Sequence, residues 1–114
     1  MTESFSANQF FYVYVIQSIT ESNLYIGHTT DLQRRIGEHN RGETFSTKIH
    51  RPWKLIYYET CLHEKDAERR ERYLKTNQGG RLLKRRLREF LYNAKANLIP
   101  DTGKDDIIKV GKTR

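Results

Sequence analysis

The sequence has little cysteine and no long apolar run, and each shortage excludes a class of protein. One cysteine, Cys61, stands among 114 residues, so neither an internal disulfide nor a zinc site built on several cysteines can form. No stretch reaches the apolar length of a membrane helix, and residues 1–4 lack the plan of a secretory signal. We therefore expect one cytoplasmic domain with no membrane partner.

Acidic residues are also scarce relative to basic ones. The 14 Asp and Glu residues are outnumbered by 21 Lys and Arg residues, which gives a formal net charge of +7. Such a balance favours a polyanionic partner, because neutralising phosphates releases counterions and drives binding; in a bacterial cell this would place the protein at the nucleoid. An ordinary basic protein with solvated lysines fits the total equally well, so the distribution of charge matters more.

Hydrophobic periodicity predicts a hairpin followed by a helix. Residues 11–16 alternate between two faces, which is typical of a strand packed on both sides. Residues 20–23 are polar and turn-forming, so residues 24–27 should return as the second strand. Thr30, followed three positions later by Gln33, predicts a capping box that opens a helix through about Arg41.

The remaining sequence predicts one more strand and two more helices. The strand covers residues 53–60, and a helix runs from about residue 63 to 76, where Gly79 and Gly80 are expected to end helical structure. The last helix runs from residue 81 to about 93, with an apolar stripe formed by Leu83, Leu87, Phe90 and Leu91.

These elements predict an α/β (α+β) fold: a three-stranded antiparallel sheet flanked by helices, in the order strand, strand, helix, strand, helix, helix. We place this domain at residues 10–93. Residues 1–9 are expected to be a flexible arm and residues 94–114 a flexible tail.

The motifs in these elements resemble the signature of the GIY-YIG nucleases. Tyr25-Ile26-Gly27 matches the second half of the motif, and Tyr12-Val13-Tyr14 stands at the first half and keeps its tyrosine. Arg35 stands ten positions after Tyr25, as the family's arginine does, and Glu71 stands in a segment similar to the family's metal-binding helix. The resemblance covers about residues 10–91, is closest to small stand-alone members, and implies metal-dependent hydrolysis of phosphodiester bonds that leaves 5′-phosphate and 3′-hydroxyl ends.

The resemblance also implies roles for four catalytic candidates. Tyr25 would accept a proton from the attacking water and Tyr14 would orient the water or the scissile phosphate. Arg35 presents a planar fork of donors to the phosphate oxygens that gain charge. His39, one helical turn later, would move a proton near neutral pH or hold a nonbridging oxygen. The structural alternatives are packing for the tyrosines and an exposed helix-end position for His39.

Glu71 is expected on the helix face that meets the sheet, where a carboxylate must be paired or bind a cation. The resemblance implies that it holds one Mg²⁺ or Mn²⁺ ion, whereas the residues alone favour a buried ion pair with Arg35 or another arginine. Gly27 is expected to leave room for a phosphate near the main chain. His28 is expected to support the base or to be exposed.

The densest basic run covers residues 69–88, and its charges are poorly balanced by acids, so it favours a phosphate-tracking surface. The expected nucleic-acid contacts are Arg34, Lys48, Arg70, Lys75, Arg81, Lys84 and Arg85. No base-reading helix is recognisable, which predicts weak sequence specificity. We expect a DNA partner, single-stranded or branched rather than a defined duplex site, with RNA left open, and a monomer or weak homodimer.

Two other classes of function stay open. Because Tyr12 and Val13 depart from the first half of the motif and a late helical asparagine has no clear counterpart, the chain could be a weak or inactive nucleic-acid-binding module of the same fold. A protein-interaction role through residues 94–114 or the basic helices is the other. Survival of a complex with a protein partner at high salt would favour the protein-interaction role, since phosphate contacts weaken steeply with salt.

Overall fold

Three strands form an antiparallel sheet in the order β2-β1-β3. They are β1 (Phe11–Ser18), β2 (Leu24–Thr29) and β3 (Trp53–Cys61). The computed structural model describes residues 9–98, so residues 1–8 of the expected arm and residues 99–114 of the expected tail lie outside the described part. The sheet and its place in the α+β order confirm the fold class that the sequence predicts.

The central strand β1 has a buried side chain on each face of the sheet, as its alternation predicts. Val13 and Val15 contribute to one core cluster, and Tyr14 and Ile16 contribute to the other. Burying a side chain of this size stabilises the fold by roughly 1.5–3 kcal/mol. The register passes from Val15 opposite Tyr57 to Ile16 opposite Leu55, so residue 56 is an extra residue in β3 and the alternation of its side chains between the two faces is interrupted there.

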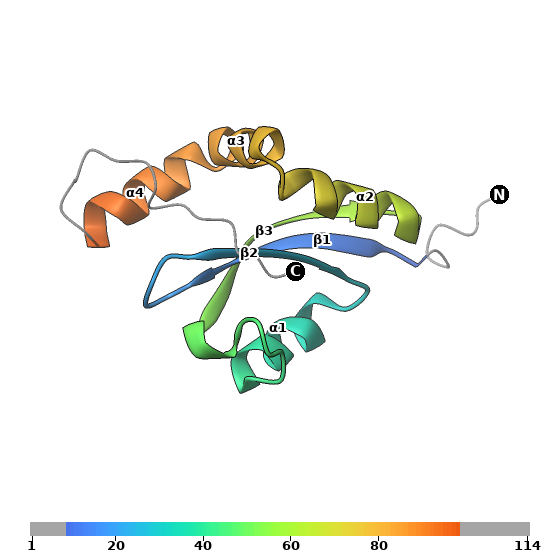
Figure 1. The fold of residues 1–114 in the computed structure, drawn as a ribbon, viewed down its shortest axis with the longest axis horizontal. Coiled ribbons are helices and arrows are strands. Elements are labelled where there is room, and N and C mark those ends of the chain that lie inside the picture. Colours follow the sequence, from blue (N-terminus) through green and yellow to red (C-terminus); the bar gives the residue numbers. More distant parts are fainter. Residues whose placement is uncertain (1–8, 99–114) are drawn as a thin grey trace.

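Helix α1 (Leu32–Arg41) covers one face of the sheet (Figure 1). Its N-cap is Asp31, one residue later than the predicted capping box, because the Asp31 carboxylate accepts the backbone N–H of Arg34 at 3.1 Å. The hydroxyl of Thr29 in turn accepts the N–H of Asp31. Gly42, with a φ of 80°, ends the helix in the left-handed conformation that glycine adopts without strain.

Three helices cover the opposite face: α2 (Glu64–Leu74), α3 (Asn77–Arg86) and α4 (Arg88–Leu98) (Figure 1). The prediction that Gly79 and Gly80 end helical structure is wrong, since both lie inside α3. The hydroxyl of Thr76 caps α3 by accepting the N–H of Gly79, and a Cβ at Gly79 would collide with the carbonyl of Tyr73. Gly79 therefore allows α3 to begin close against the end of α2.

The predicted last helix is divided at Leu87, which lies between α3 and α4. Leu83, Leu87 and Leu91 still form the expected stripe and join the core, whereas Phe90 is 38% exposed. A short 3₁₀ turn, η2 (Lys48–His50), precedes β3. None of the helices within residues 9–98 has the length and apolar character that crossing a membrane requires.

Candidate functional site

Two tyrosines of the hairpin lie side by side on the face that α1 covers. Tyr14 is opposite Gly27 and Ile16 is opposite Tyr25, so the two phenols are diagonal neighbours on adjacent strands. Their ring centroids are 6.5 Å apart. Tyr14 is fully buried, and Tyr25 is partly exposed at the edge strand β2. The hairpin therefore offers one phenol to the interior and one to the rim of the sheet.

His39 is fully buried, so the structural alternative, an exposed histidine at a helix end, is wrong. Its Nε2 lies 2.8 Å from the Tyr14 hydroxyl, and its Nδ1 lies 2.8 Å from the hydroxyl of Thr47. The Thr47 hydroxyl donates to the Thr44 carbonyl and thus accepts from Nδ1–H, which leaves Nε2 to accept the Tyr14 hydrogen. Sequence reasoning missed Thr47, because nothing local to it shows that its hydroxyl meets His39.

Burial, aided by the positive charge of Arg35, lowers the pKa of His39 to about 4. The imidazole is thus neutral near pH 7, which corrects the expectation that it titrates there. Burial also raises the pKa of Tyr14 above that of an ordinary phenol, although a hydrogen bond and the charge from Arg35 oppose this. Tyr14 therefore keeps its proton and points it at His39.

Gly27 does not leave room for a phosphate, because the Tyr14 side chain fills the space beside it. A Cβ built on Gly27 would lie 2.5 Å from the Tyr14 hydroxyl oxygen. The glycine is needed so that this phenol can lie across β2 and reach His39. The role of Gly27 is therefore to leave space for the side chain of Tyr14, one of the catalytic candidates.

Arg34 and Arg35 share the carboxylate of Glu38. Arg34 Nη1 lies 2.7 Å from one Glu38 oxygen, and Arg35 Nη1 lies 2.8 Å from the other. Arg34 is half exposed and also donates to Thr29, and Arg35 is 31% exposed. Each arginine thus keeps donors that are free to meet an anion.

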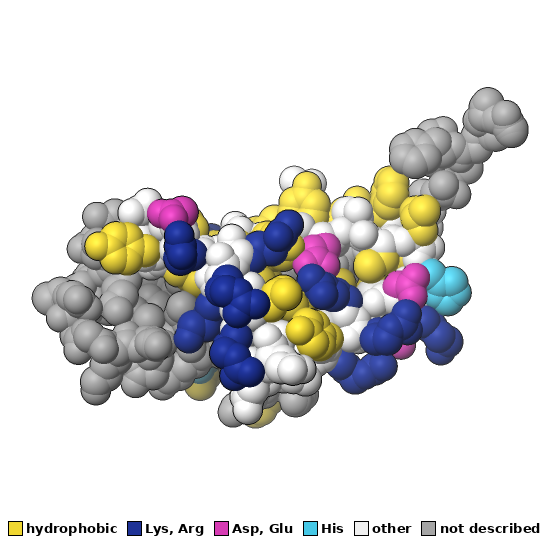
Figure 2. Space-filling view, turned by 90° about the horizontal axis from the view of Figure 1, so that it is seen from above, with side chains coloured by type: hydrophobic (Ala, Val, Ile, Leu, Met, Phe, Trp, Pro, Cys, Tyr) yellow, Lys and Arg dark blue, Asp and Glu magenta, His cyan; other side chains and the backbone are white. Residues whose placement is uncertain are grey.

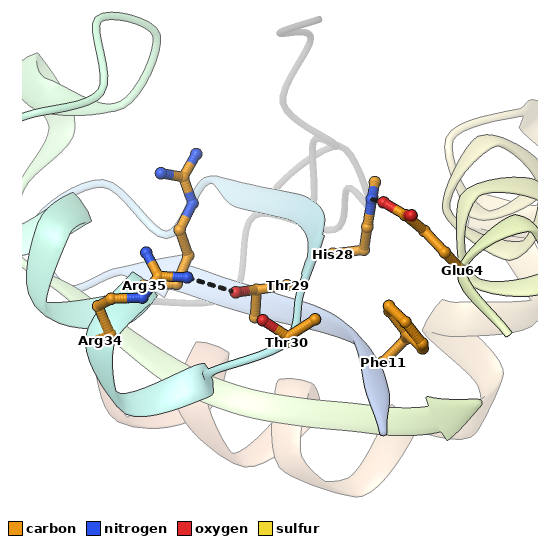
Figure 3. A pocket seen from close by; sticks show the side chains of 7 residues that line it. All are labelled: Phe11, His28, Thr29, Thr30, Arg34, Arg35 and Glu64. Carbon is orange, nitrogen blue, oxygen red and sulfur yellow. Dashed lines mark hydrogen bonds and ion pairs between the residues drawn. The ribbon is translucent and has the colours of Figure 1, made fainter. Parts of the chain in front are cut away.

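Both arginines line a cleft of about 310 Å³ between the start of α1 and the start of α2. Figure 3 shows the arginines at one end of this cleft, with His28 and Glu64 at the other. The remaining lining residues are Phe11, Thr29 and Thr30. A phosphate held by the guanidinium groups would therefore lie within reach of a carboxylate and an imidazole.

Glu71, on α2, is largely enclosed, with 18% of its side chain exposed. One oxygen lies 2.5 Å from Nδ1 of His28, and the other lies 2.8 Å from Nζ of Lys75. The expected ion pair with an arginine is therefore wrong, since the partners are a lysine and a histidine. Burial raises the pKa of Glu71, but hydrogen bonds from Lys75 and His28 outweigh it and bring that pKa below its usual value.

The Glu71 carboxylate fits a divalent cation on chemical grounds. It is ionised at neutral pH, and its two oxygens carry about four lone-pair directions, of which the two hydrogen bonds use half. The Nζ atom of Lys75 also lies 6.0 Å from the centre of the Tyr25 ring, so the ammonium that is paired with Glu71 is also close to Tyr25. A hard cation could therefore share this carboxylate without displacing either partner.

Two further acids near His28 were missed by sequence reasoning. His28, Glu64 and Glu68 bring one ligand atom each to within 4.8 Å of one another. Glu64 and Glu68 are one helical turn apart on α2, a spacing that places them on one face. The spacing is visible in the sequence, but the histidine comes from β2 and only the packing of α2 on the sheet brings it close.

The expected nucleic-acid contacts divide into two groups. Arg70 donates to both oxygens of Glu59, and Lys75 is paired with Glu71, so these two charges already have acid partners. Lys48 lies over the Phe45 ring. Within the described residues, no ion pair engages the three expected contacts on α3, which are Arg81, Lys84 and Arg85. Figure 2 shows Lys and Arg side chains spread over the face formed by α2, α3 and α4.

Comparison with known proteins gives a family match over most of the chain. The family model described as the GIY-YIG catalytic domain matches residues 10–84. A UPF0213 protein of Haloquadratum walsbyi is 41% identical over 61 residues, which cover 53% of this chain and 66% of that protein. One of Desulfotalea psychrophila is 40% identical over 67 residues, covering 56% of this chain and 59% of that protein. One of Staphylococcus haemolyticus is 39% identical over 66 residues, which cover 57% of this chain and 79% of that protein.

The matched segment thus spans about two thirds and three fifths of the first two of these relatives. No solved structure matches the chain.

Proposed function

The chain belongs to the GIY-YIG family, and from that premise we propose that it is a divalent-metal-dependent DNA endonuclease. The family is one of nucleases, so a phosphodiester substrate is the starting point. The observation that carries the proposal is the cleft, which has guanidinium groups at one end and the His28–Glu71 pair beside the other. The guanidinium groups line the cleft, and Glu71, the proposed cation ligand, is joined to it through His28, which also lines it. Anion-binding and cation-binding groups arranged in this way suit phosphoryl transfer, in which positioning and electrostatics do most of the work.

We assign the residues as follows. Arg35 stabilises the negative charge that develops on the phosphate oxygens during attack. Tyr25 is the general base that takes the proton of the attacking water. As the water oxygen bonds to phosphorus, the bond from phosphorus to the 3′ oxygen breaks, and that oxygen takes a proton from solvent to leave as a hydroxyl. Tyr14 orients the water: its hydrogen is committed to His39, so its oxygen can only accept a hydrogen bond from the water.

Glu71 would hold the metal ion, one Mg²⁺ or Mn²⁺. When bound there, the cation would supply charge stabilisation for the departing oxygen. The chain's own contribution is to keep the acid ionised and fixed in place, through Lys75 at 2.8 Å and His28 at 2.5 Å.

Single-stranded or branched DNA is the substrate that we favour. Tyr58 is 50% exposed, and its ring lies 5.8 Å from that of Tyr12 on the α1 side of the sheet. Tyr12 is paired with Thr29, which lines the cleft, so these rings lie beside the proposed reaction centre. Unpaired bases stack on exposed aromatic rings, whereas bases inside a duplex do not.

A cleavage assay tests the proposal. End-labelled single-stranded, duplex and branched DNA and RNA are incubated with the full chain while Mg²⁺ or Mn²⁺ is titrated. We expect metal-dependent cleavage of unpaired DNA with 5′-phosphate products, and a rate lower by at least about tenfold in Arg35→Lys, which lacks the planar fork. No cleavage of any substrate by the wild type, with intact binding, would overturn it.

That outcome would favour the second candidate, a nucleic-acid-binding module without turnover. The observation behind this alternative is that both Glu71 oxygens have protein partners, as expected of a structural ion pair. In such a module Arg35→Lys and Glu71→Ala would leave DNA affinity little changed, and no variant would differ from the wild type in cleavage.

A further inference from the structure

His28 has two differently occupied ring nitrogens. Its Nδ1 lies 2.5 Å from the Glu71 carboxylate, and its Nε2 faces Glu64, whose nearest oxygen is 4.0 Å away. In Figure 3 the Glu64 carboxylate points toward the imidazole across the end of the cleft. A neutral imidazole that donates Nδ1–H to Glu71 leaves the lone pair of Nε2 directed at Glu64.

This arrangement is the one that proteins use around metal-binding histidines. A ligating imidazole donates its other N–H to a carboxylate, which fixes the tautomer and the ring orientation and raises the basicity of the ligand. Glu71 is itself fixed, because Lys75 holds its second oxygen at 2.8 Å. The orienting group is thus built before any cation binds.

Glu68 completes the group from the next turn of α2. The ligand atoms of His28, Glu64 and Glu68 lie within 4.8 Å of one another. Donors about 2.1 Å from one cation are at most about 4.2 Å apart, so small rotations of the exposed Glu64 and the half-buried Glu68 side chains would bring all three ligand atoms into range. Cation binding therefore needs no movement of the backbone.

The charges also point to a cation. Glu64 and Glu68 carry like charges one turn apart, which destabilises a helix. Among the described residues, no lysine or arginine forms an ion pair with either of them, whereas Asp66 on the same helix is paired with Arg69. In a chain of net charge +7, these two acids have no lysine or arginine partner within the described residues, and the basic group beside Glu64 is the imidazole of His28.

We propose that His28, Glu64 and Glu68 form a binding site for a divalent transition metal, such as Zn²⁺, Mn²⁺ or Co²⁺. One imidazole nitrogen with two carboxylates suits these ions, and the nitrogen selects against Mg²⁺. The site is separate from the hydrolytic role proposed for Glu71, which here positions His28. It does not depend on that role, because it rests on the contacts of His28 and the two acids alone.

The test uses the full chain without nucleic acid. Co²⁺ is titrated while its visible absorption is recorded, and Zn²⁺ binding is measured by calorimetry. We expect one equivalent to bind with a spectrum that shows a nitrogen ligand, and Glu64→Gln or Glu68→Gln to weaken binding by about tenfold or more. Excess Mg²⁺ should not compete.

Asp66→Asn is the matched control, since it removes the same charge from α2 and should bind like the wild type. His28→Ala should abolish the nitrogen signature. If that variant does not fold, Glu64→Gln, at a side chain that is 58% exposed, and the isosteric Glu68→Gln still decide the matter. Absence of Co²⁺ binding, or equal affinities for Glu68→Gln and Asp66→Asn, would overturn the proposal. Cleavage in Mg²⁺ without Co²⁺ binding would remove only this inference, and Co²⁺ binding without cleavage would remove only the nuclease proposal.

Discussion

The hydroxyl of Tyr14 lies 2.8 Å from Nε2 of His39, and both side chains are buried. The contact joins the central strand to the end of α1, so it fixes the helix that carries Arg34 and Arg35 relative to the sheet. It also orders the hydrogens, from Tyr14 to His39 and from His39 to Thr47. Both stability and catalysis should therefore respond to changes in this chain of hydrogen bonds.

The first prediction concerns the loss of stability at acidic pH that arises from His39. The pKa of His39 is near 4 in the folded protein and 6.5 in its ordinary state, so the unfolded chain takes up the proton first as pH falls. The contribution of His39 to the free energy of unfolding is present above pH 6.5 and decreases as pH falls to 4, by about 3 kcal/mol in all.

Urea denaturation of the wild type and His39→Gln between pH 7 and pH 4 measures this contribution, since all other titrating groups are common to the two proteins. The stability advantage of the wild type should shrink over that range. A constant difference would contradict the burial of a neutral imidazole.

The second prediction concerns Thr47. Replacing it with valine keeps its shape but removes the acceptor for Nδ1–H of His39, and leaving a buried donor unsatisfied costs about 1–3 kcal/mol. Thr47→Ser retains the hydroxyl and should keep most of the stability in urea denaturation. A larger loss in Thr47→Ser than in Thr47→Val would mean that the methyl group, not the hydrogen bond, matters here.

The third prediction concerns Gly27. An alanine there would place its Cβ 2.5 Å from the Tyr14 hydroxyl oxygen, so the phenol must move and the contact with His39 must break. We expect Gly27→Ala to lower both the melting temperature and the single-turnover cleavage rate, the latter by at least about tenfold. Gly37→Ala is the control, because its Cβ would meet only the flexible end of Arg41. Equal behaviour of the two variants would contradict this account.

The fourth prediction concerns the surface of α3. Arg81 and Arg85 are exposed and one turn apart, with no acid partner among the described residues. Changing both to serine should weaken binding of single-stranded DNA and reduce the slope of log K against log salt by about 1.4. Changing Arg41 and Arg69, which are paired with Glu43 and Asp66, removes the same charge. If the control variant reduces the slope as much as the α3 variant does, α3 does not contact phosphate.

How much the sequence predicts depends on the range of the interaction. The alternation in β1 and the polar turn after it are local, so the hairpin and the neighbouring phenols follow from them. The Gly79–Gly80 pair misleads because Gly79 is glycine on account of the carbonyl of Tyr73, a contact that no local pattern shows. His28 and Glu71 are 43 positions apart, and no pattern in either element predicts their hydrogen bond.

The central claim is that the Glu71 carboxylate and the Arg35 guanidinium act together on a phosphodiester. Single-turnover cleavage of labelled single-stranded DNA in Mg²⁺ by wild type and Glu71→Gln, with affinity measured on the same samples, tests it most directly. Glu43→Gln, an exposed acid remote from α2, is the control. We predict a loss of at least about a hundredfold in rate for Glu71→Gln, with binding retained and the control unaffected. Equal cleavage by wild type and Glu71→Gln would contradict the account.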